Sequence, residues 1–449
     1  MRGARFYPAA VFAIAAIVLP ESAAAQTVTA PDASTSSVVL TPAQLFALAD
    51  AARDRGDFPT AEQAYRALTA NPDIEIRTEA RFRLGMMLTY QLGRHADAGV
   101  EFRKILDEKP RAGRVRLELA RINALTGNPG GAARELRAAQ AGGLPPEVRS
   151  VVGFYAAALE AQKPAGYSLG IAIAPDSNIN RATRSDTLGT VIGDFTLDED
   201  AKARSGVGLE LRGQGYLRTG LGAKVRLLSQ VSARGSLYRQ SQFNDLIASV
   251  SSGPEFTLGK DRLNFSGSAS WRWYGGDPFS RTLALSTTWT HQAGPKGQIK
   301  LGGSLGRDNN LRNDLQDATQ YTASIEYDRA LDAQSGYGTS FFASRSDAID
   351  PGYSTTSAGS GLYFYREAGP ATVVLTLGYS HLEADQRLFL YPARRVDDRY
   401  SIGLGATLRI FDLGVFAPVV QVRFERNRST IEVYDYGRVS AEFGVTAAF

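Results

Sequence analysis

The stretch RVSAEFGVTAAF, residues 438–449, indicates the fold class because apolar residues alternate along it with polar or small ones. The apolar set is Val439, Ala441, Phe443, Val445, Ala447 and Phe449. The other set is Arg438, Ser440, Glu442, Gly444, Thr446 and Ala448. Successive side chains of a β-strand point to opposite faces, so this stretch predicts a strand that is apolar on one face only.

The same alternation recurs in about fourteen segments from residue 167 onward, each near the length of a strand that crosses a bilayer. Their centres lie near Ile171, Leu211, Leu227, Ser251, Ala269, Ser286, Gly303, Ser324, Phe341, Leu362, Leu375, Leu404, Val420 and Phe443. An even number of such strands is typical of a bacterial barrel. We therefore predict a transmembrane antiparallel β-barrel over residues 166–449.

The connections between these segments alternate in length, as in outer-membrane barrels. Short ones fall at 218–222, 259–261, 294–297, 331–336, 367–370 and 411–414, and we assign these to the periplasm. The longest, 175–203 and 383–398, fall on the other side and are expected outside the cell. A soluble β-sandwich is the alternative, but it would leave the apolar faces without a covering layer.

Two further features belong to the barrel. Phe443, Val445 and Phe449 resemble the signal by which barrels are recognised for insertion, which makes the barrel-assembly machinery an expected partner and membrane lipid the expected surroundings. The inward face carries charges that we expect either to tune a channel or to stabilise its wall. These are Arg212, Arg226, Arg272, Arg409, Arg423, Arg438, Glu210, Glu326, Glu425 and Glu442.

Before the barrel, residues 41–163 show helical periodicity and an internal repeat. The small residues Ala61, Ala98 and Ala132 are 37 and 34 residues apart, close to the tetratricopeptide period of about 34. Large apolar residues follow each after four positions: Tyr65, Phe102 and Leu136. We predict paired helices of this repeat type, with a generic helical bundle as the alternative.

Such repeats present a concave face that holds a partner polypeptide. In this register the residues that face the groove are Phe46, Arg53, Arg83, Tyr90, Arg114 and Arg121. Arginines between aromatic rings would suit an acidic or extended peptide, although ordinary solvated helix faces can look the same.

At the start of the chain, Arg2 and Arg5 precede an apolar run of about eleven residues and a small-residue site at 23–25. We expect a cleaved signal peptide at 1–25 and a linker at 26–40. The run is shorter than the ~20 residues that a spanning helix needs.

Composition narrows the function classes. The 449 residues include no Cys and three His, which excludes thiolate metal sites and a Cys nucleophile and disfavours a His-rich metal site. Lys and Arg total 50 against 46 Asp and Glu, too even a balance to indicate a nucleic-acid-binding protein. No catalytic constellation and no cofactor or metal motif appears, so we expect a non-enzymatic protein.

The order of helical repeats followed by a barrel resembles the surface lipoprotein assembly modifier family. The resemblance rests on IAPDSNIN (173–180) and on RSTIEVYDYGR (428–438) with the strand that follows. It implies an outer-membrane barrel with a periplasmic repeat domain, whose clients are surface lipoproteins or secreted haem- and metal-acquisition proteins. Periplasmic chaperones are further candidate partners. The residues that match the junction motif are Pro175, Asp176, Ser177, Asn178 and Asn180.

Two other functions remain open from the sequence. An exopolysaccharide exporter also joins tetratricopeptide repeats to a barrel, and the other alternative is a passive porin whose periplasmic domain plays no part in transport.

Overall fold

The computed structural model describes residues 40–126, 128–141, 165–222, 224–259, 261–294, 296–411 and 416–447. The predicted signal peptide (1–25) and Phe449 lie outside the described residues, as does the predicted linker (26–40) except for its last residue. Within the described part, no helix is both long enough and apolar enough to cross a membrane.

Six helices come first in the described chain. They are α1 (Pro42–Asp54), α2 (Phe58–Thr69), α3 (Ile74–Tyr90), α4 (His95–Glu108), α5 (Gly113–Leu125) and α6 (Pro129–Ala141). Local signals set their ends: Asp57 and Asp73 accept backbone N–H bonds at the starts of α2 and α3. Gly56 and Gly93 adopt φ of +79° and +63°, the left-handed conformation that ends a helix.

The helices pack in sequential pairs around the residues that defined the repeat. Tyr65 and Phe102 are fully buried, as are the small residues Ala61 and Ala98. Gly85 of α3 lies against the Phe102 ring, and a Cβ at this position would come within 2.6 Å of Cε1. Close helix approach thus depends on small residues, as expected. The tetratricopeptide assignment itself stays a prediction.

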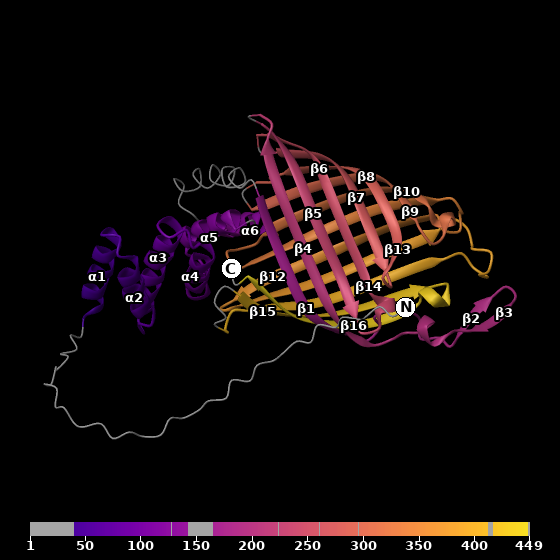
Figure 1. Cartoon of the computed structure of the whole chain (residues 1–449), viewed down its shortest axis with the longest axis horizontal. Helices are drawn as coiled ribbons and strands as arrows, with labels where there is room; N and C mark the ends of the chain where they lie inside the picture. Colours follow the sequence, from indigo (N-terminus) through magenta and orange to yellow (C-terminus); the bar gives the residue numbers. More distant parts are fainter. Residues whose placement is uncertain are drawn as a thin grey trace, which may run out of the picture. The chain divides into compact units, whose positions relative to one another are not determined.

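Fourteen strands form a closed antiparallel barrel (Figure 1). They are β1 (Ala165–Asp176), β4 (Gly206–Gly220), β5 (Val225–Tyr238), β6 (Asp245–Leu258), β7 (Asp261–Tyr274), β8 (Asp277–His291), β9 (Gly297–Asn310), β10 (Ala318–Ala330), β11 (Ser335–Ala348), β12 (Thr355–Ala368), β13 (Ala371–Ala384), β14 (Val396–Leu408), β15 (Phe416–Ser429) and β16 (Tyr436–Ala447). Each predicted centre falls inside one strand. The predicted fold class, helices followed by a barrel of about fourteen strands, is confirmed.

Consecutive strands pair as neighbours, and β1 joins β16 to close the ring. Leu283 and Leu285 of β8 point outward and are largely exposed, whereas Ser266 and Ser286 bond to each other on the opposite face. This alternation gives a lipid-compatible outer surface and a polar lumen.

The connections show the predicted asymmetry only in part, since 409–415, on the predicted periplasmic side, is longer than 239–244, 349–354 and 430–435 on the other side. The β7–β8 connection, on the predicted external side, is a turn of Gly275 and Gly276 with φ of +66° and +91°, the signature of a tight hairpin. The long connection after β1 contains a hairpin of β2 (Thr187–Thr190) and β3 (Gly193–Thr196), which the sequence did not predict.

Candidate functional site

The six residues predicted to face a groove lie on three alternate helices. Phe46 and Arg53 belong to α1, Arg83 and Tyr90 to α3, and Arg114 and Arg121 to α5. These are the first helices of the successive pairs. With the repeat spacings of 37 and 34, Phe46 and Arg53 correspond to Arg83 and Tyr90, whereas Arg114 and Arg121 lie three positions before the corresponding residues of α5.

Arginine–aromatic stacks connect these three helices. The guanidinium carbon of Arg83 lies 4.7 Å from the centre of the Phe46 ring, joining α3 to α1. Arg121 lies 4.6 Å from the Tyr90 ring, and Arg114 lies 4.7 Å from Phe82, both joining α5 to α3. Cation–π contacts of this kind contribute about 0.5–1 kcal/mol each at exposed sites. Phe82 is not among the residues that the repeat register predicted to face the groove.

Asp50 of α1 neutralises part of this surface. It accepts from Arg53 Nη1 at 3.1 Å, from Arg83 and from the hydroxyl of Tyr65. Burial, together with the hydrogen bond to Asp50, raises the pKa of Tyr65. The predicted groove is therefore less basic at α1 than its arginines alone suggested. Arg114 makes no ion pair within the described residues, so its charge is not balanced in the same way.

The junction motif lies where β1 ends and meets the start of β16. Asp176 forms a salt bridge with Arg438, whose Nε lies 2.7 Å from Oδ2. Ser177 donates its backbone N–H to the Val439 carbonyl and accepts the Val439 N–H on its hydroxyl. The fully buried Asn178 donates from Nδ2 to the carbonyls of Gly437 and Ala182.

The rest of the motif organises the connection after β1. Asn180 donates to the carbonyls of Asp200 and Lys202 and accepts from the backbone N–H of Arg204. Pro175 lies in β1 opposite Val207. The motif thus holds one end of the β1–β16 junction and folds the loop beside it.

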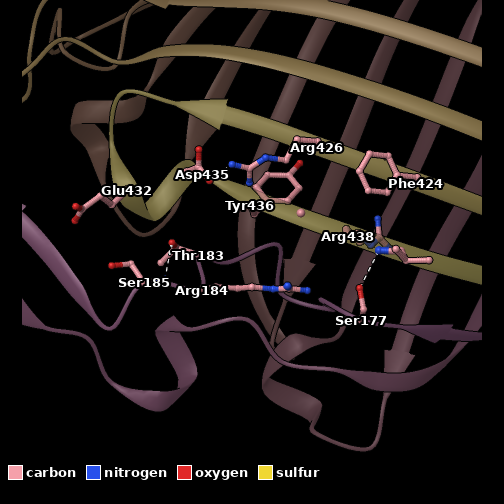
Figure 2. A pocket seen from close by; sticks show the side chains of 12 residues that line it. Ser177, Thr183, Arg184, Ser185, Phe424, Arg426, Glu432, Asp435, Tyr436 and Arg438 are labelled. Carbon is pink, nitrogen blue, oxygen red and sulfur yellow. Dashed lines mark hydrogen bonds and ion pairs between the residues drawn. The ribbon is translucent and has the colours of Figure 1, made fainter.

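A cavity of about 670 Å³ opens beside this junction (Figure 2). Its walls come from the β1–β4 connection, from β15 and from the start of β16. Arg426 pairs with Asp435 at 2.6 Å, and Glu432 accepts the backbone N–H of Gly189. Figure 2 shows the side chain of Arg184 extending from the connection towards Ser177. Ser177, Asp435 and Arg438 of its lining lie in the two stretches that carry the family resemblance, but the sequence did not predict a cavity there.

Several of the predicted lumen charges pair across strands. Arg212 of β4 bonds to Glu442 of β16 at 2.9 Å, and Lys300 lies 3.2 Å from Glu326. Arg272 bonds to Asp245 at 2.8 Å. Glu425 accepts from the Tyr436 hydroxyl. The remaining members, Glu210, Arg226 and Arg423, lie on β4, β5 and β15.

Arg409 departs from the predicted lumen set. It lies just beyond β14, and its Nη2 is 3.1 Å from Asp107 of α4. Burial raises the pKa of Asp107. Burial and the nearby Arg103 lower the pKa of Arg409. Since both side chains are largely buried, the loss of hydration offsets part of the attraction within this pair.

A buried cluster that the sequence did not reveal joins the helices to β12. Glu135 of α6 accepts from Arg103 at 3.2 Å and from Arg116 at 2.7 Å. Glu367 at the end of β12 lies 2.7 Å and 3.0 Å from the same two arginines. All four side chains are at most 9% exposed. The carboxylates raise the pKa of Arg103 although its burial acts in the opposite direction.

The predicted insertion signal is only partly described. Phe443 and Val445 of β16 project outward with half of each side chain exposed, while Phe449 lies outside the described residues. Within the described chain, no group of three or more His, Cys, Asp or Glu has the arrangement of a metal site.

Comparison with known proteins adds three findings. The profile of the family described as surface lipoprotein assembly modifier matches residues 167–447, which is nearly the whole barrel. A surface lipoprotein assembly modifier of Moraxella catarrhalis is 25% identical over 229 residues, or 51% of this chain. The matched part is 44% of that relative, so the chain spans less than half of its length.

Solved structures with a related barrel are distant in sequence. The outer-membrane channel DcaP of Acinetobacter baumannii is 10% identical, with a TM-score of 0.40 over 63% of this chain and 97% of its own. OmpT of Vibrio cholerae is 9% identical, with a TM-score of 0.36 over 63% and 99%. A bacterial polysaccharide outer-membrane secretin is 10% identical, with a TM-score of 0.32 over 63% and 98%.

Proposed function

Because the chain belongs to the surface lipoprotein assembly modifier family, we propose that its barrel is a translocon that delivers client proteins to the cell surface. The clients are surface lipoproteins or secreted haem- and metal-acquisition proteins. The observation that carries the proposal is the family match over 167–447, which includes nearly every residue of β1 to β16. The barrel itself lies in the outer membrane.

We propose that the client first meets the face formed by α1, α3 and α5. Three arginine–aromatic stacks lie along this face, each spanning two of these helices. Aromatic rings and guanidinium planes bind extended chain by stacking, and the guanidinium donors bond carboxylates and backbone carbonyls. The surface therefore suits an extended segment that carries acidic residues.

The buried cluster supports a direct transfer from helices to barrel. Arg103 and Arg116 each bond to Glu135 in the helices and to Glu367 at the end of β12. Two positive and two negative charges balance in this cluster, and desolvated pairs of this kind demand specific geometry. We infer that the cluster keeps the client-binding face in register with the periplasmic end of the barrel. The barrel-assembly machinery and periplasmic chaperones are proposed partners during biogenesis.

The experiment compares cells that carry the full chain with cells that carry residues 26–162 after the same leader. Surface lipoproteins are labelled with a membrane-impermeant biotin reagent and identified by mass spectrometry, and the culture medium is analysed for secreted proteins. We expect loss of specific lipoproteins from the labelled set when the barrel is absent. Unchanged labelling and secretion would refute the proposal.

A second comparison tests the helical face alone. The triple variant Arg83→Gln, Arg114→Gln and Arg121→Gln removes three charges from α3 and α5. Its matched control, Arg66→Gln, Arg94→Gln and Lys104→Gln, removes three exposed charges elsewhere on the helices. We expect reduced display only with the first variant. An equal loss of surface display in both variants would show that the number of charges removed, and not their position on this face, sets the effect.

A further inference from the structure

Two arginines lie on the outward face of the barrel wall, near its external end. Arg281 of β8 comes two positions before the outward-facing Leu283, so it shares that face. Arg307 of β9 lies directly opposite Leu283, and opposite residues of an antiparallel pair lie on the same face. The periplasmic helices bond to the other end of β9, where Gln298 accepts from Arg137 of α6. Arg281 and Arg307 therefore lie away from the periplasm.

Neither arginine is neutralised by a carboxylate of the protein. Both are exposed, and within the part of the chain that the structure describes neither forms an ion pair. The guanidinium of Arg307 makes one long hydrogen bond, 3.4 Å to the Thr319 hydroxyl. Asp317, in the connection after β9, accepts instead from the Asn309 side chain and from the backbone N–H of the following residue. Two positive charges are thus left for a partner outside the chain.

Aromatic neighbours place these charges at the boundary between hydrocarbon and headgroups. Trp271 of β7 lies directly opposite Arg281. Tyr321 of β10 lies opposite Leu305, which is two positions below Arg307 on β9. Trp and Tyr are enriched at the two membrane interfaces of a barrel, where a girdle of aromatic side chains flanks the apolar band. The outer-leaflet headgroups therefore surround Arg281 and Arg307.

A groove in the apolar wall begins directly below Arg307. Its volume is about 430 Å³, and its lining includes Leu283, Leu285 and Leu305 as well as Arg307 itself. Small-ligand pockets have volumes of about 300–1,000 Å³. Gly267 of β7, opposite Leu285, helps to leave this space, because a Cβ there would meet its nearest side-chain atom only at 3.9 Å. The groove opens to the face of the barrel that the membrane covers.

We propose that this place, the Arg281–Arg307 site, binds a phosphorylated lipid of the outer leaflet. The lipid phosphate bonds to the two guanidinium groups, which match the geometry of phosphate oxygens, and one acyl chain lies in the groove against Leu283 and Leu305. Lipid is the occupant because the site is on the membrane-facing surface, and because two cations directly above an apolar groove complement a phosphate joined to an acyl chain. The site is separate from the helical face and from the lumen.

The test uses the full chain purified in detergent and lipid A, a diphosphorylated lipid, as the probe. Native mass spectrometry measures how much lipid A is bound across a titration. The variant Arg281→Gln with Arg307→Gln removes the two unpaired charges. The control, Arg345→Gln with Arg426→Gln, removes two charges that Asp385 and Asp435 already neutralise. Migration of unheated samples in SDS gels shows that each variant barrel is folded.

We expect about tenfold weaker binding of lipid A to the double variant, because two exposed charge pairs are lost, and unchanged binding to the control. Lipid A stripped of its phosphates should bind the unmodified chain and the double variant equally weakly. Gly267→Leu, which extends a side chain into the groove, should weaken binding of intact lipid A with both arginines in place. Inorganic phosphate at millimolar concentration should not displace the lipid.

Equal binding of lipid A by the unmodified chain and the double variant would overturn the proposal. Displacement of lipid A by inorganic phosphate, with no effect of Gly267→Leu, would also overturn it by showing an anion site that does not recognise lipid. A third contrary result is association of two or more copies of the chain that is lost in the double variant, since this face would then be an interface between copies.

Discussion

The buried cluster around Glu135 gives the most quantitative prediction. Replacing Glu135 by Gln keeps the side-chain volume but removes the carboxylate that Arg103 and Arg116 share at 3.2 Å and 2.7 Å. Both arginines are at most 5% exposed, so the remaining cluster would hold two buried positive charges against Glu367 and against Asp107, which lies 3.7 Å from Arg103. Breaking a buried pair in this way costs about 3–5 kcal/mol. Since the Gln amide oxygen still accepts one bond, we expect a value near the lower end.

The unfolding of the helices and the unfolding of the barrel can be followed separately in this chain. All three tryptophans, Trp271, Trp273 and Trp289, lie in β7 and β8 and report on the barrel by fluorescence. Circular dichroism at 222 nm reports mainly on the helices. Urea titration of the full chain in detergent should show a helical midpoint lowered by roughly 2–3 M if the m-value is about 1–1.5 kcal/mol/M. The tryptophan transition should stay in place.

Glu62→Gln is the matched control, since Glu62 also accepts from two arginines, Arg66 at 2.7 Å and Arg94 at 2.8 Å. Those guanidinium side chains are 47% and 43% exposed, and exposed pairs contribute about 1 kcal/mol or less. The midpoint should hardly move. If both variants shift the helical midpoint equally, burial does not set the strength of the cluster and our reasoning is wrong.

Two further predictions concern the helical pairs. In Gly85→Val the new Cβ would lie 2.6 Å from the Phe102 ring, and overpacking of this kind costs about 1–3 kcal/mol. The urea midpoint of the helices should therefore fall, and adding Phe102→Leu should restore part of it. An unchanged midpoint in Gly85→Val would contradict the close packing. Tyr65 has a folded-state pKa raised above its unfolded value, so the stability that it contributes is complete below pH 10 and is lost as the pH rises through the raised value. Urea midpoints measured upward from pH 9 should decline less steeply in Tyr65→Phe than in the unmodified chain, and equal slopes would rule out this titration as the cause.

The barrel was predictable from the sequence because its signal is local and repeated. Each strand shows the two-residue period, and every predicted centre lies within an observed strand. The resemblance drawn from the junction motif and the last strand was confirmed by the family match. The β2–β3 hairpin was missed because two strands of four residues are too short to establish a period.

The features that were not predictable depend on contacts between distant residues. Arg116 and Glu367 are 251 positions apart, and neither stands in a pattern that marks it as buried. Arg409 continues the alternation of β14 in the sequence, but the strand ends one residue earlier and the side chain meets Asp107.

The strand order shows where on the barrel the helices are attached. The contacts that the helices make with the barrel include Gln298 of β9, Glu367 of β12, Arg409 after β14 and residues of β10. β10 is seven strands from β1 in either direction around the ring. The helices are thus attached to the ring on the side that includes β10, away from the strand pair β1–β16 that closes it. The attachment of the helices and the closure of the ring therefore depend on different strands.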